Sequence, residues 1–361
     1  MRSVWYRTLM ANDVLTENRS GSRRFAPLGI IFGLLGLLLF AYFVSRAGVG
    51  EIVSNIQRLG AGFILILAIS STRYIVRALA WTRSVEPPYR LPFRDAFAAR
   101  LMGDALGNII PFVSVAVSEP SKAVFVKDRV PLMAGLSALA IENIFYALTV
   151  AIFIFSGTAT LLLTFSLPKG LRYASIGALV TTLVIISLVY LVIRRQARFL
   201  SGSLRFLENR RVAPKLIGKL KPRAQSLEDR VYGFYTKSQR SFLSIFLLDM
   251  CFHLAGMLEV YVTLLFISPV APTLVQAFIL ESVNRIINVA FKFIPLRAGV
   301  DEGGTGQVSK VLGFAKGIGV TLAIIRKGRD IFWSAVGLLL IWKNGRGLTQ
   351  MNADQNPRLS A

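Results

Sequence analysis

Ionisable residues interrupt several long apolar segments of this 361-residue sequence. A charge at the centre of a membrane helix costs about 3 kcal/mol on insertion scales, so such residues usually face a bundle interior or water. The sequence therefore predicts a polar interior that can receive a charged ligand. The candidates in these segments are Arg73, Glu142, Asp249, Glu259, Glu281, Arg285 and Arg326.

Some charged residues are spaced four apart, which places both members of a pair on one helical face. The pairs are Arg73 with Arg77, Asp249 with His253, and Glu281 with Arg285. Each pair also has a structural interpretation. The two arginines could extend toward the membrane surface. Glu281 and Arg285 could form a local ion pair. Asp249 could lie near water at the entrance of its helix, and His253 could make a structural hydrogen bond.

Two apolar stretches, residues 93–127 and 274–310, are interrupted by glycine, proline and charge. Proline removes a backbone N–H and disrupts a helix, and irregular backbone at membrane depth must be surrounded by protein or water. We expect each stretch to form a hairpin that enters the bilayer and returns, broken at Pro111 and at Pro295. The alternative is a pair of short full spans in each stretch.

Acidic residues follow both breaks. Glu119, beside Pro120, comes eight residues after the first proline, and Glu302 comes seven residues after the second. Asp104 precedes the first break, and Arg297 lies close to Glu302 in sequence. Charges of both signs beside irregular backbone predict a polar cavity that receives a lipid headgroup. The alternative is that proline and glycine only turn the chain at a membrane surface.

The elements that must position these residues are apolar helices. Hydrophobic residues make up 54% of the chain, and the mean hydropathy is +0.57. Runs close to the ~20 residues that cross a hydrocarbon core predict an all-α polytopic membrane protein with about six to eight transmembrane helices, including the two broken hairpins. The predicted spans are residues 27–44, 61–82, 131–155, 173–193, 242–267 and a part of 314–342.

The net charge is +23, and the position of the basic residues in the chain indicates contact with a membrane surface. Residues 194–240 contain 13 Lys and Arg against 3 Asp and Glu. Basic loops beside spans usually lie in the cytoplasm and face anionic lipid headgroups. We expect this loop and both termini on the cytoplasmic side of a bacterial inner membrane. The expected partners are membrane lipids, with their anionic headgroups at the loop, rather than nucleic acid.

This orientation divides the chain into three parts: a basic tail at residues 1–26, one transmembrane domain at 27–342, and a tail at 343–361. The halves of the domain, at about residues 27–156 and 172–342, each contain two spans, a hairpin and a span, in opposite orientation. The sequence thus predicts an inverted repeat of the kind found in secondary transporters. Chance similarity between two short motifs is the alternative.

The sequence contains no recognisable catalytic or metal-binding pattern. It has one histidine and one cysteine, so neither a disulfide nor a cysteine-rich metal site is expected. A nucleotide-binding Gly-x-x-x-x-Gly-Lys-Ser/Thr loop is also missing from it. We expect a transporter with no cofactor, no metal and no enzymatic activity. The alternatives are a membrane-embedded lipid transferase that uses carboxylates alone, and a non-transporting partner of a cytosolic lipid or glycan biosynthesis enzyme.

Two motifs resemble signatures of the lysylphosphatidylglycerol synthase-type flippase domain family. The first is GDALGNIIP at residues 103–111, followed by Glu119 and Lys122. The second is IPLRAGVDEG at residues 294–303, followed by Gly313 and Arg326. The resemblance covers about residues 27–342 and implies a lipid flippase fold with re-entrant segments.

Domains of this family are thought to translocate modified phospholipids or related lipid-linked molecules. By resemblance, the lipid path would be lined or shaped by Asp104, Glu119, Pro295, Glu302 and Arg326. This chain departs from the family pattern at Ser118, where glycine is usual, and at residues 296–299, where Arg297 could favour an anionic headgroup. Fewer than twenty residues follow Trp342, so we expect no aminoacyl-transfer domain, and a separate lipid-modifying enzyme could be a partner.

Overall fold

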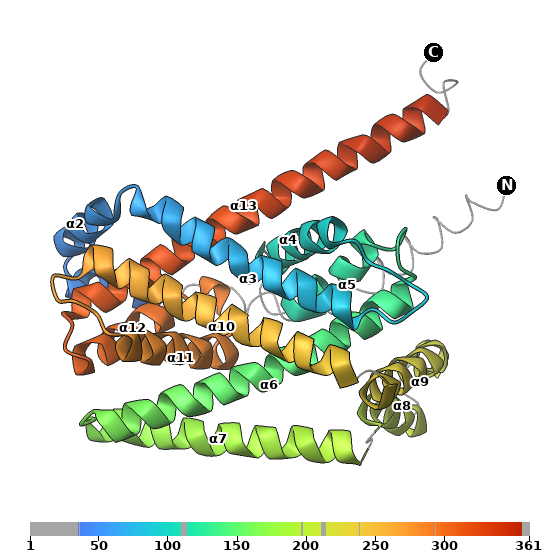
Figure 1. Cartoon of the computed structure of the whole chain (residues 1–361), viewed down its shortest axis with the longest axis horizontal. Helices are drawn as coiled ribbons and strands as arrows, with labels where there is room; N and C mark the ends of the chain where they lie inside the picture. The colour runs from blue at the N-terminus through green and yellow to red at the C-terminus, as the bar shows by residue number, and fades with distance from the viewer. Residues whose placement is uncertain are drawn as a thin grey trace.

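The structure is a computed structural model that describes residues 35, 37–109, 114–195, 198–210, 214–237, 239–292 and 294–355. Every regular element within these residues is helical (Figure 1), which confirms the all-α class. The predicted basic tail at 1–26, the predicted break at Pro111 and the first part of the predicted span at 27–44 lie outside the described residues.

The described helices range from 11 residues in α2 to 40 in α13. Their bounds are α2 (Val49–Leu59), α3 (Gly62–Ser84), α4 (Phe93–Ile109), α5 (Ser114–Phe125), α6 (Leu132–Thr164), α7 (Lys169–Arg194), α8 (Phe199–Asn209), α9 (Pro214–Lys237), α10 (Gln239–Ile267), α11 (Leu274–Ala290), α12 (Val300–Val311) and α13 (Lys316–Gln355), with a 3-10 turn, η1 (Pro295–Arg297), before α12.

Four helices in the described part of the chain are long and apolar enough to cross a membrane: α3, α6, α7 and α10. The bent pair Leu37–Ala47 and Val49–Leu59, whose helices meet at 84°, makes a fifth if it is one span. α13 carries four charged residues between Arg326 and Asp330 and is not among them. These helices make the chain a multi-pass membrane protein.

The centre of the bundle is the pair α3 and α10, which lie side by side (Figure 1). α4 packs against α13, and α11 packs against α6. α7 returns along α6 at the edge, where apolar side chains such as Leu183 and Leu188 are exposed, as expected of a helix that faces lipid. α8 and α9 pack against each other at one end of the bundle (Figure 1).

α6 is longer than its apolar run predicted. The predicted span ended at residue 155, but the helix continues to Thr164. Gly157 is a packing position, since a Cβ atom there would lie 1.9 Å from Ser282 Oγ on α11. Glycine in this helix therefore brings α11 close and does not end the helix.

The first broken stretch forms two helices, α4 and α5, that pack against each other. Pro120 lies inside α5 and does not end it. Proline has no backbone N–H to donate within the helix. The next residue, Ser121, donates its side-chain hydroxyl to the Val117 carbonyl at 2.6 Å. α5 has 12 residues, about 18 Å at 1.5 Å per residue, so it is too short to cross a hydrocarbon core of about 30 Å by itself.

The second broken stretch has the same organisation. α11 begins at a capping box in which Thr273 and Gln276 bond reciprocally, and α12, again 12 residues, packs back against α11. Between the two helices, Leu296 and Arg297 both adopt left-handed φ angles, 48° and 51°. Such angles cost of order 1–3 kcal/mol each for residues with side chains, so the packing of α11 and α12 must hold this turn in place.

Candidate functional site

A pocket of about 190 Å³ lies within the bundle, and arginine dominates its wall. The arginines come from four helices: two from α3 and one each from α4, α11 and α13. The charged lining residues are Arg73, Arg77, Arg100, Arg285, Arg329, Asp104 and Asp330. Three buried acids, Glu142, Glu259 and Glu281, pair with these arginines and organise the site.

Glu142, on α6, holds two of the arginines and is fully buried. It accepts hydrogen bonds from Arg77 at 2.7 and 2.9 Å and forms an ion pair with Arg100 at 3.2 Å. Asn143 accepts a further bond from Arg77 at 3.0 Å, and the ring of Tyr146 lies 3.8 Å from its guanidinium carbon. Arg77 is therefore fixed in the interior and does not extend to the membrane surface.

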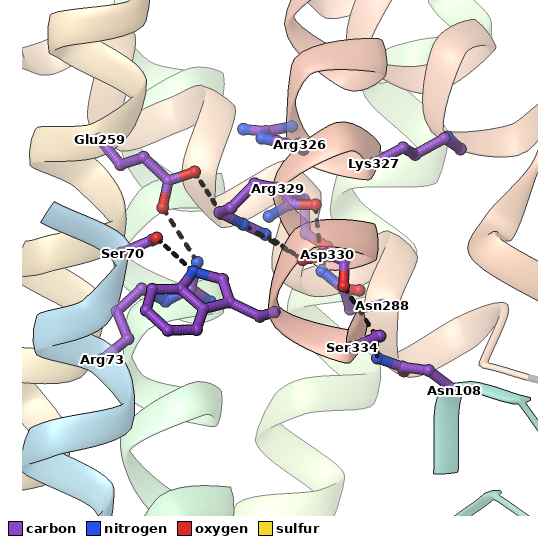
Figure 2. Close-up of polar contacts among 12 residues, drawn as sticks. Ser70, Arg73, Asn108, Glu259, Asn288, Arg326, Lys327, Arg329, Asp330 and Ser334 are labelled. Atoms are coloured by element: carbon purple, nitrogen blue, oxygen red, sulfur yellow. Dashed lines mark hydrogen bonds and ion pairs between the residues drawn. The ribbon is translucent and has the colours of Figure 1, made fainter. Parts of the chain in front are cut away.

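Glu259, on α10, lies between Arg73 of α3 and Arg329 of α13 (Figure 2). Arg73 is 3.3 Å from one carboxylate oxygen, and Arg329 donates to the other. Arg329 also donates to Asp330, which accepts a bond from Arg297 at 3.1 Å. One buried carboxylate thus connects the two central helices to α13.

Glu281, on α11, bonds Arg285 one turn along the same helix. Its second oxygen accepts from Asn284 at 3.0 Å and lies 3.5 Å from Arg326 of α13. Gly256 of α10 permits this arrangement, because a Cβ there would lie 2.5 Å from Glu281 Oε1. The local ion pair predicted from the spacing exists, and it continues into a contact between helices.

A lysine neutralises the acids of the first hairpin. Lys122 Nζ lies 2.7 Å from Asp104 and 2.7 Å from Glu119. Ser118 donates to Asp104 at 3.3 Å. Asn143 donates to Glu119 at 3.0 Å and connects this hairpin to the Glu142 cluster.

A lysine also neutralises the acids of the second hairpin. Lys327 of α13 lies 2.5 Å from Glu302 and 3.6 Å from Asp301. Glu302 also accepts a bond at 2.7 Å from the backbone N–H of Gly299, at the start of α12. The acid that follows each break is therefore paired with a lysine and is not an open carboxylate.

Several buried guanidinium nitrogens in this region have no hydrogen-bond partner among the residues that the structure describes. They are Nε of Arg73 and Arg297, Nε and Nη1 of Arg326, and all three nitrogens of Arg100. A buried donor without an acceptor carries the full cost of its lost hydration. The arrangement therefore favours an anion, and the planar fork of arginine suits a phosphate or carboxylate.

The structure brings most of the predicted site residues into this region. Arg73, Asp104 and Arg285 line the pocket, and Glu142, Glu259 and Glu281 lie behind its arginines. Arg326 joins α13 to α11, and Arg297 contacts Asp330 although the sequence pointed to Glu302. Pro295 is the first residue of the 3-10 turn η1. Asp249 is fully buried on α10, so it does not lie near water as its structural interpretation required.

Sequence reasoning missed three charged residues of the pocket: Arg100, Arg329 and Asp330. The signal for Arg329 and Asp330 was present, since they interrupt the last apolar segment. Arg100 lies eleven residues before the proline of the first break and was not among the predicted site residues. In the residues that the structure describes, no group of three His, Cys, Asp or Glu side chains could hold a metal ion.

The fold and the site together define a helical multi-pass membrane protein with a charged pocket in its interior. The model of the family described as Lysylphosphatidylglycerol synthase TM region matches residues 27–337, and the chain belongs to this family. Membership gives the protein a function related to membrane lipids. No curated protein and no solved structure matches the chain.

Proposed function

We propose that the protein moves an anionic phospholipid, or a lipid-linked molecule with a phosphate in its headgroup, between the leaflets of the bacterial inner membrane. The headgroup enters the arginine-lined pocket while the acyl chains remain in an apolar environment. The termini and the basic loop at residues 194–240 face the cytoplasm in this scheme. No residue is assigned a catalytic role.

The observation that carries the proposal is the pocket with its five arginines, of which Arg73 and Arg100 have guanidinium nitrogens without a hydrogen-bond partner among the described residues. A phosphate accepts charge-assisted hydrogen bonds from arginine, and a bidentate pair fixes its orientation. Arg100 is the best placed of these side chains, because it is buried, lines the pocket, and makes no hydrogen bond in the described structure.

The second hairpin offers both environments that a lipid needs. Glu302 of α12 points into the charged interior, where it meets Lys327. The adjacent Gly303 and Gly304 line an apolar cavity of about 760 Å³ together with residues of α7 and α11. A segment with polar contacts on one side and an apolar cavity on the other suits a molecule with a charged headgroup and hydrocarbon tails.

The inverted-repeat hypothesis gains support from the packing of the helices. α4 contacts α13, and in the matching position α11 contacts α6. Arg100 of the first hairpin forms an ion pair with Glu142 of the following span, and in the second half Glu281 forms one of several ion pairs with the following helix, to Arg326, with the signs exchanged. We propose that movement of one half against the other exposes the pocket to each leaflet in turn.

Liposomes containing the purified protein test this function. Fluorescent lipids with anionic and zwitterionic headgroups are scored for accessibility to a quencher added outside. Arg100→Gln removes a pocket cation, and Glu142 keeps Arg77 as its partner. We expect wild type to exchange anionic lipids and Arg100→Gln to do so more than about tenfold more slowly, the effect of losing about 1.4 kcal/mol of headgroup binding.

Arg129→Gln is the matched control. Arg129 pairs with Asp95 at 3.1 Å on the exposed surface, so this variant makes the same chemical change outside the pocket. Folded wild-type protein that exchanges no lipid, with or without an ion gradient, contradicts the proposal. In that case a role as a membrane partner of a lipid-modifying enzyme becomes the better hypothesis.

A further inference from the structure

Asp249 is a buried acid that the proposed headgroup site does not use. It lies on α10 and is fully inaccessible to solvent, and neither carboxylate oxygen has a hydrogen-bond partner in the part of the chain that the structure describes. An ionised carboxylate in this position would lose its hydration without gaining a bond, a cost of several kcal/mol. A proton on Asp249 removes most of that cost.

Charged groups from three other helices act electrostatically on this carboxyl group. Arg77 of α3, Arg100 of α4 and Glu142 of α6 are within electrostatic reach of it. His253 lies one turn further along α10, next to Thr149 at 3.3 Å, and the arginines Arg73 and Arg285 act on its ring. Both charged arginines and the acid Glu281 therefore act on this histidine.

The cluster that Asp249 faces has an unbalanced charge. Arg77 and Arg100 carry two positive charges, and Glu142 supplies one negative charge between them. The remaining positive charge can be neutralised from either of two sides. Asp249 can do so when it is ionised, and an anion can do so from the pocket that Arg77 and Arg100 line.

We propose that Asp249 is a proton-binding site coupled to headgroup binding, so that one proton from solution binds Asp249 when an anionic headgroup occupies the pocket. The inference rests on the proposed function. Two negative charges that compete for the same arginines repel each other, and the proton relieves that repulsion. By linkage the effect is reciprocal: a proton on Asp249 strengthens headgroup binding, and a bound headgroup strengthens proton binding.

The consequence is transport of an anionic headgroup together with a proton. The pair adds no net charge to the buried cluster, so the occupied pocket can cross the membrane interior at lower electrostatic cost. A proton gradient across the membrane could then drive the lipid in one direction. Neither nucleotide nor metal is needed for this step.

Proton uptake on ligand binding tests the inference. The purified protein in weakly buffered detergent solution is mixed with a short-chain phosphatidylglycerol, whose phosphodiester keeps one charge over the working pH range. Binding is measured in parallel by the quenching of the intrinsic tryptophan fluorescence. The comparison is made among wild type, Asp249→Asn, which imitates the protonated acid, and His253→Gln, which removes the only other titratable group on this face of α10.

At pH values where Asp249 is ionised in the empty protein, we expect wild type to take up about one proton per bound lipid. In the same pH range its affinity for the lipid should fall up to tenfold per pH unit as the pH rises. Asp249→Asn should bind the lipid with no proton uptake and no pH dependence, and His253→Gln should resemble wild type. Binding without proton uptake in wild type, or uptake that survives in Asp249→Asn, overturns the inference and leaves the headgroup site intact. Absence of binding in all three proteins overturns the proposed function and this inference together.

Discussion

Replacing Glu142 with glutamine should destabilise the protein more than any comparable change on its surface. The substitution keeps the size of the side chain and removes the carboxylate that pairs with Arg77 at 2.7 Å and Arg100 at 3.2 Å. Both arginines would then be buried without this carboxylate, and the groups left to act on Arg77 would be Asn143, Tyr146 and the carboxyl group of Asp249. Breaking a buried ion pair by removing one partner typically costs about 3–5 kcal/mol, because the other charge stays desolvated.

The free energy of unfolding in mixed micelles, measured against a rising fraction of denaturing detergent, gives this quantity directly. Asp95→Asn is the matched control, since Asp95 forms its ion pair with Arg129 at a similar distance, 3.1 Å, but on the surface. Exposed ion pairs contribute about 0–1 kcal/mol, so the control should change little. The double variant Glu142→Gln with Arg100→Gln should recover part of the loss, because one of the two unpaired cations is removed.

Equal effects of Glu142→Gln and Asp95→Asn would refute the reasoning. That result would mean that water or lipid headgroups reach the Glu142 cluster and hydrate the arginines. A large loss that the double variant does not relieve would mean that Arg100 contributes to packing more than to charge balance.

Three further changes test other parts of the fold by the same unfolding measurement. Gly157→Leu should lower stability by about 1–3 kcal/mol, because the new side chain overlaps Ser282, whereas no loss would show that α6 and α11 are not in close contact. Thr273→Ala removes the capping box of α11 and should lower the free energy of unfolding by about 1 kcal/mol. An unchanged free energy of unfolding would mean that water replaces the hydrogen bonds of this cap. Trp333→Phe removes the indole bond to Ser70 at 2.8 Å and should also cost about 1 kcal/mol, with Ser70→Ala giving a similar loss if the bond is the cause.

Much of the helical framework was predictable from local sequence. The apolar segments at 61–82, 131–155, 173–193 and 242–267 correspond to α3, α6, α7 and α10, because a run of apolar residues that crosses a bilayer must satisfy its backbone as a helix. The errors occur where a residue has two roles. Gly157 lies beyond the predicted end of its span but is a packing position inside α6, and Pro120, a residue type that disrupts helices, lies inside α5.

The chemical character of the interior was also predictable. Desolvation penalises a charge in lipid wherever it stands, so the sequence by itself determined that Arg73, Glu142, Glu259 and Arg326 would turn inward. It could not determine their partners. Glu259 pairs with Arg73 and Arg329, which are 186 and 70 residues away in the chain.

Those pairings depend on how each helix is rotated about its axis and where two helices cross, and both are set by packing over the whole interface. Tertiary structure therefore decided that five arginines line one pocket, that a lysine neutralises the acid after each break, and that Asp249 has no hydrogen-bond partner among the described residues. The sequence determined which side chains must leave the lipid, and only the packed bundle decided which of them meet.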